Sequence, residues 1–169
     1  VRLEWTEQAR FRSTRIQTDL SENLSTGSVR FSGEVEFLDT ADGEFGVELT
    51  VRHPDGRMGE GRATINSLSR GQRQPFAVDV TVENPQLWFP NGYGDQPLYR
   101  IEGRLVGTPG RLYDIRQRRA GFRRLEFVPN TNDLEVQETS GQTNRMWSIV
   151  GRPYPWTLVV NGRRIFTKG

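Results

Sequence analysis

The chain has 169 residues, a net charge of +2 and no cysteine, and each of these facts excludes a class of protein or site. A chain of this length buries roughly 68–70% of its unfolded surface as one domain, so its stability requires neither a disulfide nor a metal. Without thiols there can be no zinc–thiolate site, cysteine nucleophile or redox switch. A cysteine-free domain suits the cytoplasm, the periplasm or secretion equally.

The basic side chains are almost all arginine, because Lys168 is the only lysine among 23 Lys and Arg residues. A nucleic-acid-binding domain would gather such charge on one face. Here Asp and Glu are interleaved with the arginines, and only residues 116–124 (RQRRAGFRR) are locally basic. No apolar run approaches the roughly 20 residues that span a bilayer. We therefore expect neither nucleic acid nor a membrane as a partner.

Short alternating segments separated by turns fill the chain, and each predicts a strand with one face in the core and one in water. The predicted strands cover residues 1–5, 11–20, 27–38, 47–51, 62–66, 74–82, 98–106, 113–127 and the final hairpin, 157–167. Asn161-Gly162 gives that hairpin the strongest turn signal in the sequence. No segment keeps a helical period for three turns, and residues 129–155 are expected to form a long surface excursion. The sequence therefore predicts an all-β, antiparallel β-sandwich of roughly eight to ten strands.

The residue types that carry chemistry form no catalytic pattern. His53, the single histidine, sits in a His-Pro-Asp-Gly turn, where an exposed turn residue is expected rather than a general base. Phosphate-binding glycine loops, His–Glu metal spacing and a Gly-x-Ser-x-Gly elbow are all absent from the sequence. Glycosidases use paired carboxylates, but Glu34 and Glu36 are predicted on the solvent face of a strand. We expect no catalytic residue, cofactor or metal.

The basic run 116–124 has three interpretations. Its arginines could bind phosphate or a carboxylate, since arginine is a bidentate donor. They could instead cover the outer face of a strand while Ala120, Phe122 and Leu125 pack or bend around Gly121. They could also form an interface with another domain. We favour the structural interpretation, because a run of charge usually marks a solvated face.

Residues 83–99 (ENPQLWFPNGYGDQPLY) are too apolar for a solvated loop and too rich in proline for a helix. They predict an ordered connection in which Trp88 plugs the end of the sandwich while Asn91-Gly92 turns the chain. The alternative is a carbohydrate-binding or adhesion module, in which Trp88, Phe89 and Tyr93 stack on sugar rings.

Three segments taken together resemble the immunoglobulin-like β-sandwich domain of glycoside hydrolase family 2, closest to its β-mannosidases and exo-β-glucosaminidases. They are residues 83–99, 118–127 (RRAGFRRLEF) and 158–169 (LVVNGRRIFTKG). The sequence departs from the family at Phe89, where a second tryptophan is usual. Its segment 128–156 is also longer than is usual there.

The resemblance implies one immunoglobulin-like domain over residues 1–169, excised from between a jelly-roll domain and a TIM barrel. In that family the catalytic glutamates lie on the barrel, so none is carried over to this chain. The implied partners are these neighbouring domains, in a parent that acts on β-linked glycosides. The residues expected to form a structural signature or domain interface are Trp88, Pro90, Asn91, Gly121, Phe122, Arg123, Asn161 and Gly162.

Overall fold

A computed structural model describes residues 8–40, 43–66, 69–129 and 156–166. The described residues fall into two compact units, which divide between Arg123 and Arg124. The strands of the first unit are β1 (Ala9–Leu20), β2 (Thr26–Phe37), β3 (Phe45–Arg52), β4 (Met58–Ile65), β5 (Arg73–Glu83), β6 (Tyr99–Gly107) and β7 (Arg111–Ala120). Those of the second unit are β8 (Leu125–Pro129), β9 (Trp156–Val160) and β10 (Arg163–Ile165).

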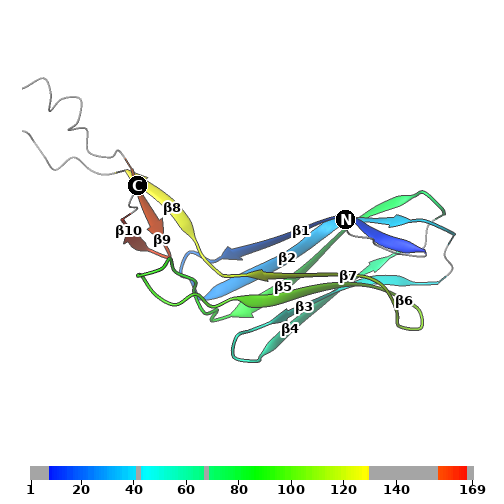
Figure 1. Cartoon of the computed structure of the whole chain (residues 1–169), viewed down its shortest axis with the longest axis horizontal. Helices are drawn as coiled ribbons and strands as arrows, with labels where there is room; N and C mark the ends of the chain where they lie inside the picture. Colours follow the sequence, from blue (N-terminus) through cyan, green and yellow to red (C-terminus); the bar gives the residue numbers. More distant parts are fainter. Residues whose placement is uncertain (1–7, 41–42, 67–68, 130–155, 167–169) are drawn as a thin grey trace, which may run out of the picture. The chain divides into compact units, whose positions relative to one another are not determined.

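The first unit is a sandwich of two antiparallel sheets, β1-β2-β5 and β4-β3-β6-β7 (Figure 1). This strand order is that of an immunoglobulin-like domain. Strands β1, β2 and β5 take the places of A, B and E, and β3, β6 and β7 take those of C, F and G. Strand β4 extends the second sheet beside β3. The prediction of an all-β, antiparallel, immunoglobulin-like sandwich is confirmed.

The core lies between the two sheets and is filled by the inward positions of the alternating strands. The four inward side chains predicted on each of β2 and β5 are all buried: Val29, Phe31, Val35, Phe37, Phe76, Val78, Val80 and Val82. The sheets approach closely where Phe31 faces Gly103, because a Cβ built on Gly103 would lie 2.2 Å from Cε1 of Phe31. The Phe11, Phe31 and Phe76 rings pack together with centroids 5.0–5.4 Å apart.

The prediction of one long or bulged strand over residues 113–127 is wrong, because two strands in different sheets replace it. Strand β7 ends at Ala120, and β8 begins at Leu125 and pairs with β9. Between them Phe122 turns into the core, where it is fully buried. Leu125, the first residue of β8, is 53% exposed.

The second unit is a three-stranded antiparallel sheet in the order β10-β9-β8. Its hairpin confirms the predicted turn: Asn161 and Gly162 have φ values of 50° and 76°, and Arg163 pairs with Val160. Positive φ at both central residues is the requirement of a type I′ turn. The predicted strand 1–5 and most of the predicted excursion 129–155 lie outside the described residues. A single domain over residues 1–169 stays a prediction.

Candidate functional site

The connection between β5 and β6 is held against the segment that follows β7. The Trp88 backbone N–H donates to the Phe122 carbonyl at 2.8 Å, and Leu87 and Phe122 form an isolated parallel bridge. The Gln86 backbone N–H donates to the Tyr99 hydroxyl, also at 2.8 Å. These bonds satisfy backbone groups that no sheet ladder serves. Residues 83–99 are thus an ordered connection, as predicted.

Trp88 packs between a glycine and an arginine from the facing segment. A Cβ on Gly121 would lie 2.7 Å from Cβ of Trp88, so a larger residue there would displace the tryptophan. The guanidinium carbon of Arg123 lies 4.8 Å from the centroid of the Trp88 ring, within the range of a cation–π contact. Trp88 is half-buried in this arrangement.

Phe122, rather than Trp88, supplies the fully buried ring at this end of the sandwich. Its exposed fraction is 0%, and it meets the Tyr99 ring edge-on, with centroids 4.8 Å apart. A Cβ on Gly27 of β2 would lie 2.6 Å from Cε1 of Phe122. The end is therefore closed by Phe122 and Tyr99, with Trp88 packed outside them.

The turn within the connection is formed by residues 90–93, which begin with Pro90 and include Gly92. The Tyr93 N–H donates to the Pro90 carbonyl at 3.0 Å, and Gly92 has a φ of 84°. These are the features of a type II turn with glycine at its third position. Asn91 is exposed at the tip, while Tyr93 is half-buried.

The structure contradicts the expected exposure of His53. The residue begins the predicted His-Pro-Asp-Gly turn, but its side chain is only 8% exposed and its ring packs on Tyr99 with centroids 5.0 Å apart. Burial, reinforced by the nearby Arg57 charge, lowers the pKa of His53, whereas Asp55 acts in the opposite direction. Its buried Nδ1 has no hydrogen-bond partner in the described part of the chain. His53 is therefore a neutral packing residue beside the connection.

Glu36 is not a free carboxylate of the solvent face. It lies between two arginines of the neighbouring strands, 2.7 Å from Arg10 and 3.2 Å from Arg73. The Arg10 hydrogen bond, followed by the charges of both arginines, lowers the pKa of Glu36 despite its partial desolvation. A general acid in a glycosidase needs the opposite shift. Glu34 is exposed, as predicted.

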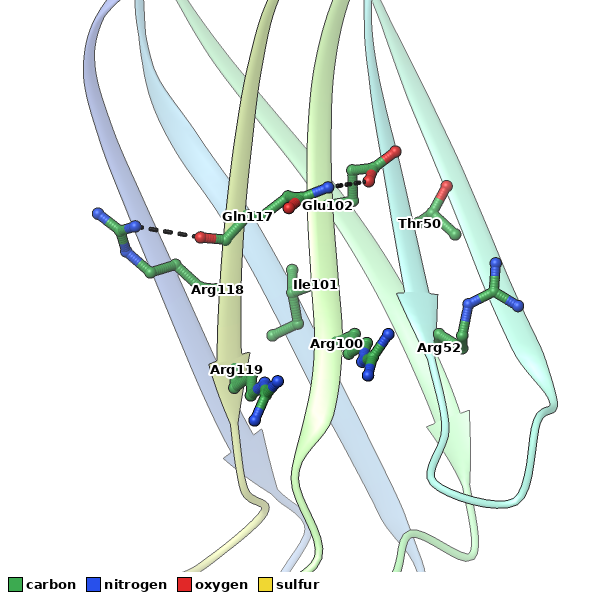
Figure 2. A pocket seen from close by; sticks show the side chains of 8 residues that line it. All are labelled: Thr50, Arg52, Arg100, Ile101, Glu102, Gln117, Arg118 and Arg119. Carbon is green, nitrogen blue, oxygen red and sulfur yellow. Dashed lines mark hydrogen bonds between the residues drawn. The ribbon is translucent and has the colours of Figure 1, made fainter.

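The basic run 116–124 separates into different environments once folded. Arg116 pairs with Asp114 on its own strand, and Arg123 lies over Trp88. Arg118 donates to the Gln117 carbonyl at 3.1 Å. Arg119 lies beside a groove of about 640 Å³ along β3, β6 and β7, to which Arg52 and Arg100 also contribute (Figure 2).

In the second unit, Asn161 ties the hairpin to the first residue after the sandwich. Its Oδ1 accepts from the Arg124 N–H at 2.7 Å, and its own N–H donates to the Arg124 carbonyl at 2.9 Å. The side chain is 8% exposed. Asn161 thus does more than adopt the positive φ of the turn, because it also fixes the start of β8. Gly162 beside it is exposed.

Metal-ligating side chains do not converge in the described ranges, where no three His, Asp or Glu residues are placed to hold an ion. No described helix is long and apolar enough to cross a membrane. Sequence reasoning found the connection, the Gly121–Arg123 segment and the hairpin. It missed the burial of His53 and the meeting of Arg52 with Arg100 and Arg119, because both depend on pairing between distant strands.

Comparison with known proteins identifies the family to which the chain belongs. The family model for glycosyl hydrolases family 2 matches residues 9–123, and the chain belongs to this family. An exo-beta-D-glucosaminidase of Hypocrea jecorina is 25% identical over 143 residues, 84% of this chain and 15% of that protein. Beta-mannosidase A of Aspergillus oryzae is 30% identical over 141 residues, 82% of this chain and 13% of that protein.

Solved structures share the fold. The beta-D-mannosidase of Dictyoglomus thermophilum matches with a TM-score of 0.68 at 21% identity, covering 98% of this chain and 17% of that one. A putative beta-galactosidase of Bacteroides fragilis matches with the same TM-score at 17% identity, covering 95% and 20%. The chain thus spans about one-seventh of the length of the two sequence relatives.

Proposed function

We propose that this chain is an accessory domain of a larger glycoside hydrolase that acts on β-linked glycosides. It would position a sugar-binding-like jelly-roll domain and a catalytic barrel against each other, and it would perform no hydrolysis itself. The observation that carries the proposal is the family match over the sandwich, residues 9–123, in a chain that spans only 13–15% of the glucosaminidase and mannosidase relatives.

Two carboxylates with a shifted pKa, Glu36 and Asp55, fit a non-catalytic role. A retaining glycosidase needs two carboxyl groups about 5–5.5 Å apart, one of them with a raised pKa. In this chain Arg10 and Arg73 lower the pKa of Glu36, while the backbone hydrogen bond from Arg57, and then the Arg57 side chain, lower the pKa of Asp55. Both groups are thereby kept ionised, which suits ion pairing and not proton donation.

The residues of the expected signature have a structural role in this proposal. Gly121 admits Trp88, Arg123 covers the Trp88 ring, and Phe122 closes the core. In the second unit, Asn161 and Gly162 shape a hairpin that is fixed to Arg124. A rigid connection at each of these places is what a domain that positions its neighbours requires.

The contacts of the aromatic side chains weigh against the alternative of a sugar-stacking platform. A stacking ring must present one open face, but Trp88 is half-buried and lies under Arg123. Phe89 packs on Gly94, where an added Cβ would lie 3.0 Å from Cδ2 of the phenylalanine ring.

Two measurements on the 169-residue chain test the proposed function. The chain is expected to release no nitrophenol from 4-nitrophenyl β-D-mannoside or β-D-glucosaminide, while beta-mannosidase A of Aspergillus oryzae, assayed alongside on the mannoside, serves as the positive control. Calorimetric titration with mannose, chitosan and β-mannan oligosaccharides is expected to give no saturable heat. Turnover by the chain would make it an enzyme, and saturable heat lost in Trp88→Ala would make it a carbohydrate-binding module.

A further inference from the structure

Three arginines from three adjacent strands lie in one row on the outer face of the sheet β4-β3-β6-β7. The strand register places Arg52 of β3 opposite Arg100 of β6, and Arg100 opposite Arg119 of β7. All three are exposed, and Figure 2 shows their side chains at the same level of the sheet. We call these residues the arginine row.

The arginine row has no acidic partner among the described residues, unlike Arg30 and Arg62 elsewhere in the sandwich. Arg30 lies 3.7 Å from Asp79 and Arg62 lies 3.5 Å from Glu48. In contrast, no ion pair or side-chain hydrogen bond involves a guanidinium of the arginine row in the described ranges. The next acidic side chain on this face, Glu102, accepts a hydrogen bond from Gln117 at 2.6 Å.

Such a row is unfavourable in the isolated chain. Side chains directly opposite one another on adjacent strands have Cβ atoms about 4.5–5.5 Å apart, and like charges at that spacing destabilise a sheet. Carboxylates brought by a partner would replace this repulsion with charge-assisted hydrogen bonds, which arginine can make two at a time. The groove of about 640 Å³ beside the row leaves space for them.

We propose that the arginine row binds an acidic surface of another protein domain, one that presents two or three neighbouring Asp or Glu side chains. The inference rests on the proposed function, because it names the surface by which an accessory domain would meet its neighbour. Arginine is enriched at protein interfaces and often contributes most to their binding free energy.

The surroundings of the row favour a protein partner over nucleic acid. On β4 the residue opposite Arg52 is Met58, which is 52% exposed, and methionine is also enriched at protein interfaces. A phosphate backbone requires a basic track, but the next row of this face holds Thr50, Glu102 and Gln117. Uncharged and acidic side chains therefore interrupt the basic surface directly beside the arginine row.

The first test measures repulsion within the row by thermal unfolding of the 169-residue chain. Arg100→Glu places a carboxylate between two arginines, so we expect its melting temperature to rise by up to about 4 °C, as an ion pair of ordinary strength would give in a domain of this size. Arg100→Gln should give a smaller rise. Arg15→Glu is the control, because Arg15 is an exposed arginine of β1 that faces Ser32. A rise no larger than that of the control would overturn the proposal.

The second test measures binding of a fluorescent hexaglutamate peptide by anisotropy at low salt. Saturable binding is expected, and it should weaken about tenfold or more in Arg52→Gln/Arg119→Gln, the factor that corresponds to one charge-assisted hydrogen bond. Arg12→Gln/Arg15→Gln removes the same charge from β1 and should bind as the wild type does.

Three results would overturn the proposal: no binding, equal weakening in both double variants, or tighter binding of a DNA duplex or inorganic phosphate than of the peptide. Because neither test involves hydrolysis or sugar, the arginine row can fail while the accessory function stands. Conversely, the accessory function fails if glycoside turnover is observed, whatever these two tests give.

Discussion

The two sheets of the sandwich each carry a cross-strand row of three charged residues, and the rows differ at the centre. Across β1-β2-β5 the row reads Arg10–Glu36–Arg73, here called the paired row. Across β3-β6-β7 the arginine row has Arg100 in the central place. Glu36 makes ion pairs of 2.7 and 3.2 Å to both its neighbours, whereas the arginine row has no ion pair in the described part of the chain.

This comparison shows that the role of an arginine in a sheet depends on the residue opposite it. In the paired row the positive charges are paired within the domain, because both arginines contact Glu36. In the arginine row the same residue type leaves positive charge directed outward. The paired row therefore balances its charges within the domain, whereas the arginine row is suited to a partner that brings carboxylates.

The largest effect on stability is expected from a substitution in the core between the two sheets. Its size gives a reference for the smaller effects expected in either row. Phe31→Ala should lower the free energy of unfolding by about 3–5 kcal/mol, the range for a buried aromatic side chain, since Phe31 is 0% exposed and faces Gly103. Urea unfolding measures this change. Ile115→Ala, at a side chain 38% exposed, is the control. A loss no greater than the control's would contradict the packing described for the core.

The next effect would come from making the two rows alike. Glu36→Arg turns the paired row into three arginines, so we expect the melting temperature of the chain to fall. Glu34→Arg makes the same charge change on the same strand at an exposed carboxylate that makes no described ion pair. It should therefore lower the melting temperature less. If the two variants had the same melting temperature, the loss of stability would come from the change in net charge and not from the ion pairs of the paired row.

Acid should weaken the paired row alone. Because the pKa of Glu36 is held below 4.5 in the folded chain, its ion pairs stabilise the fold above pH 4.5 and are lost as the pH falls below that value. In Glu36→Gln the melting temperature should therefore fall less steeply below pH 4.5. Arg100→Gln should keep the wild-type slope, because arginine stays protonated throughout. If Arg100→Gln, and not Glu36→Gln, flattened the dependence of melting temperature on pH, the acid sensitivity would not come from the paired row.

We expect the smallest effect on stability at His53, the residue that follows Arg52 of the arginine row in the sequence. Its pKa is lowered from 6.5 by burial and by Arg57, so its contribution to stability is present above pH 6.5 and is lost as the pH falls through the folded-state pKa. His53→Phe keeps a ring against Tyr99 and should remove this dependence. Melting temperatures between pH 7 and pH 5 measure it, and an unchanged slope in the variant would show that His53 is not the titrating group.

Much of the fold follows from local pattern. The alternation of Val29, Phe31, Val35 and Phe37 predicts which face of β2 is buried, and Asn161-Gly162 predicts its hairpin, because strand period and positive φ belong to the residues themselves. Sequence reasoning failed at residues 113–127, where Gly121 lets Trp88 approach and the chain leaves the sheet. It failed again at His53, because only pairing of β3 with β6 brings Tyr99 against that turn.

By itself the sequence determined most of the strands, the Asn161-Gly162 turn and the family, since each depends on residues close together in the chain or on segments recognisable as they stand. Only the tertiary structure decided which charges meet. Arg52, Arg100 and Arg119 are separated by long stretches of sequence, and a one-residue change in register would move any of them to the opposite face. The arginine row exists because β6 lies between β3 and β7 in one particular register.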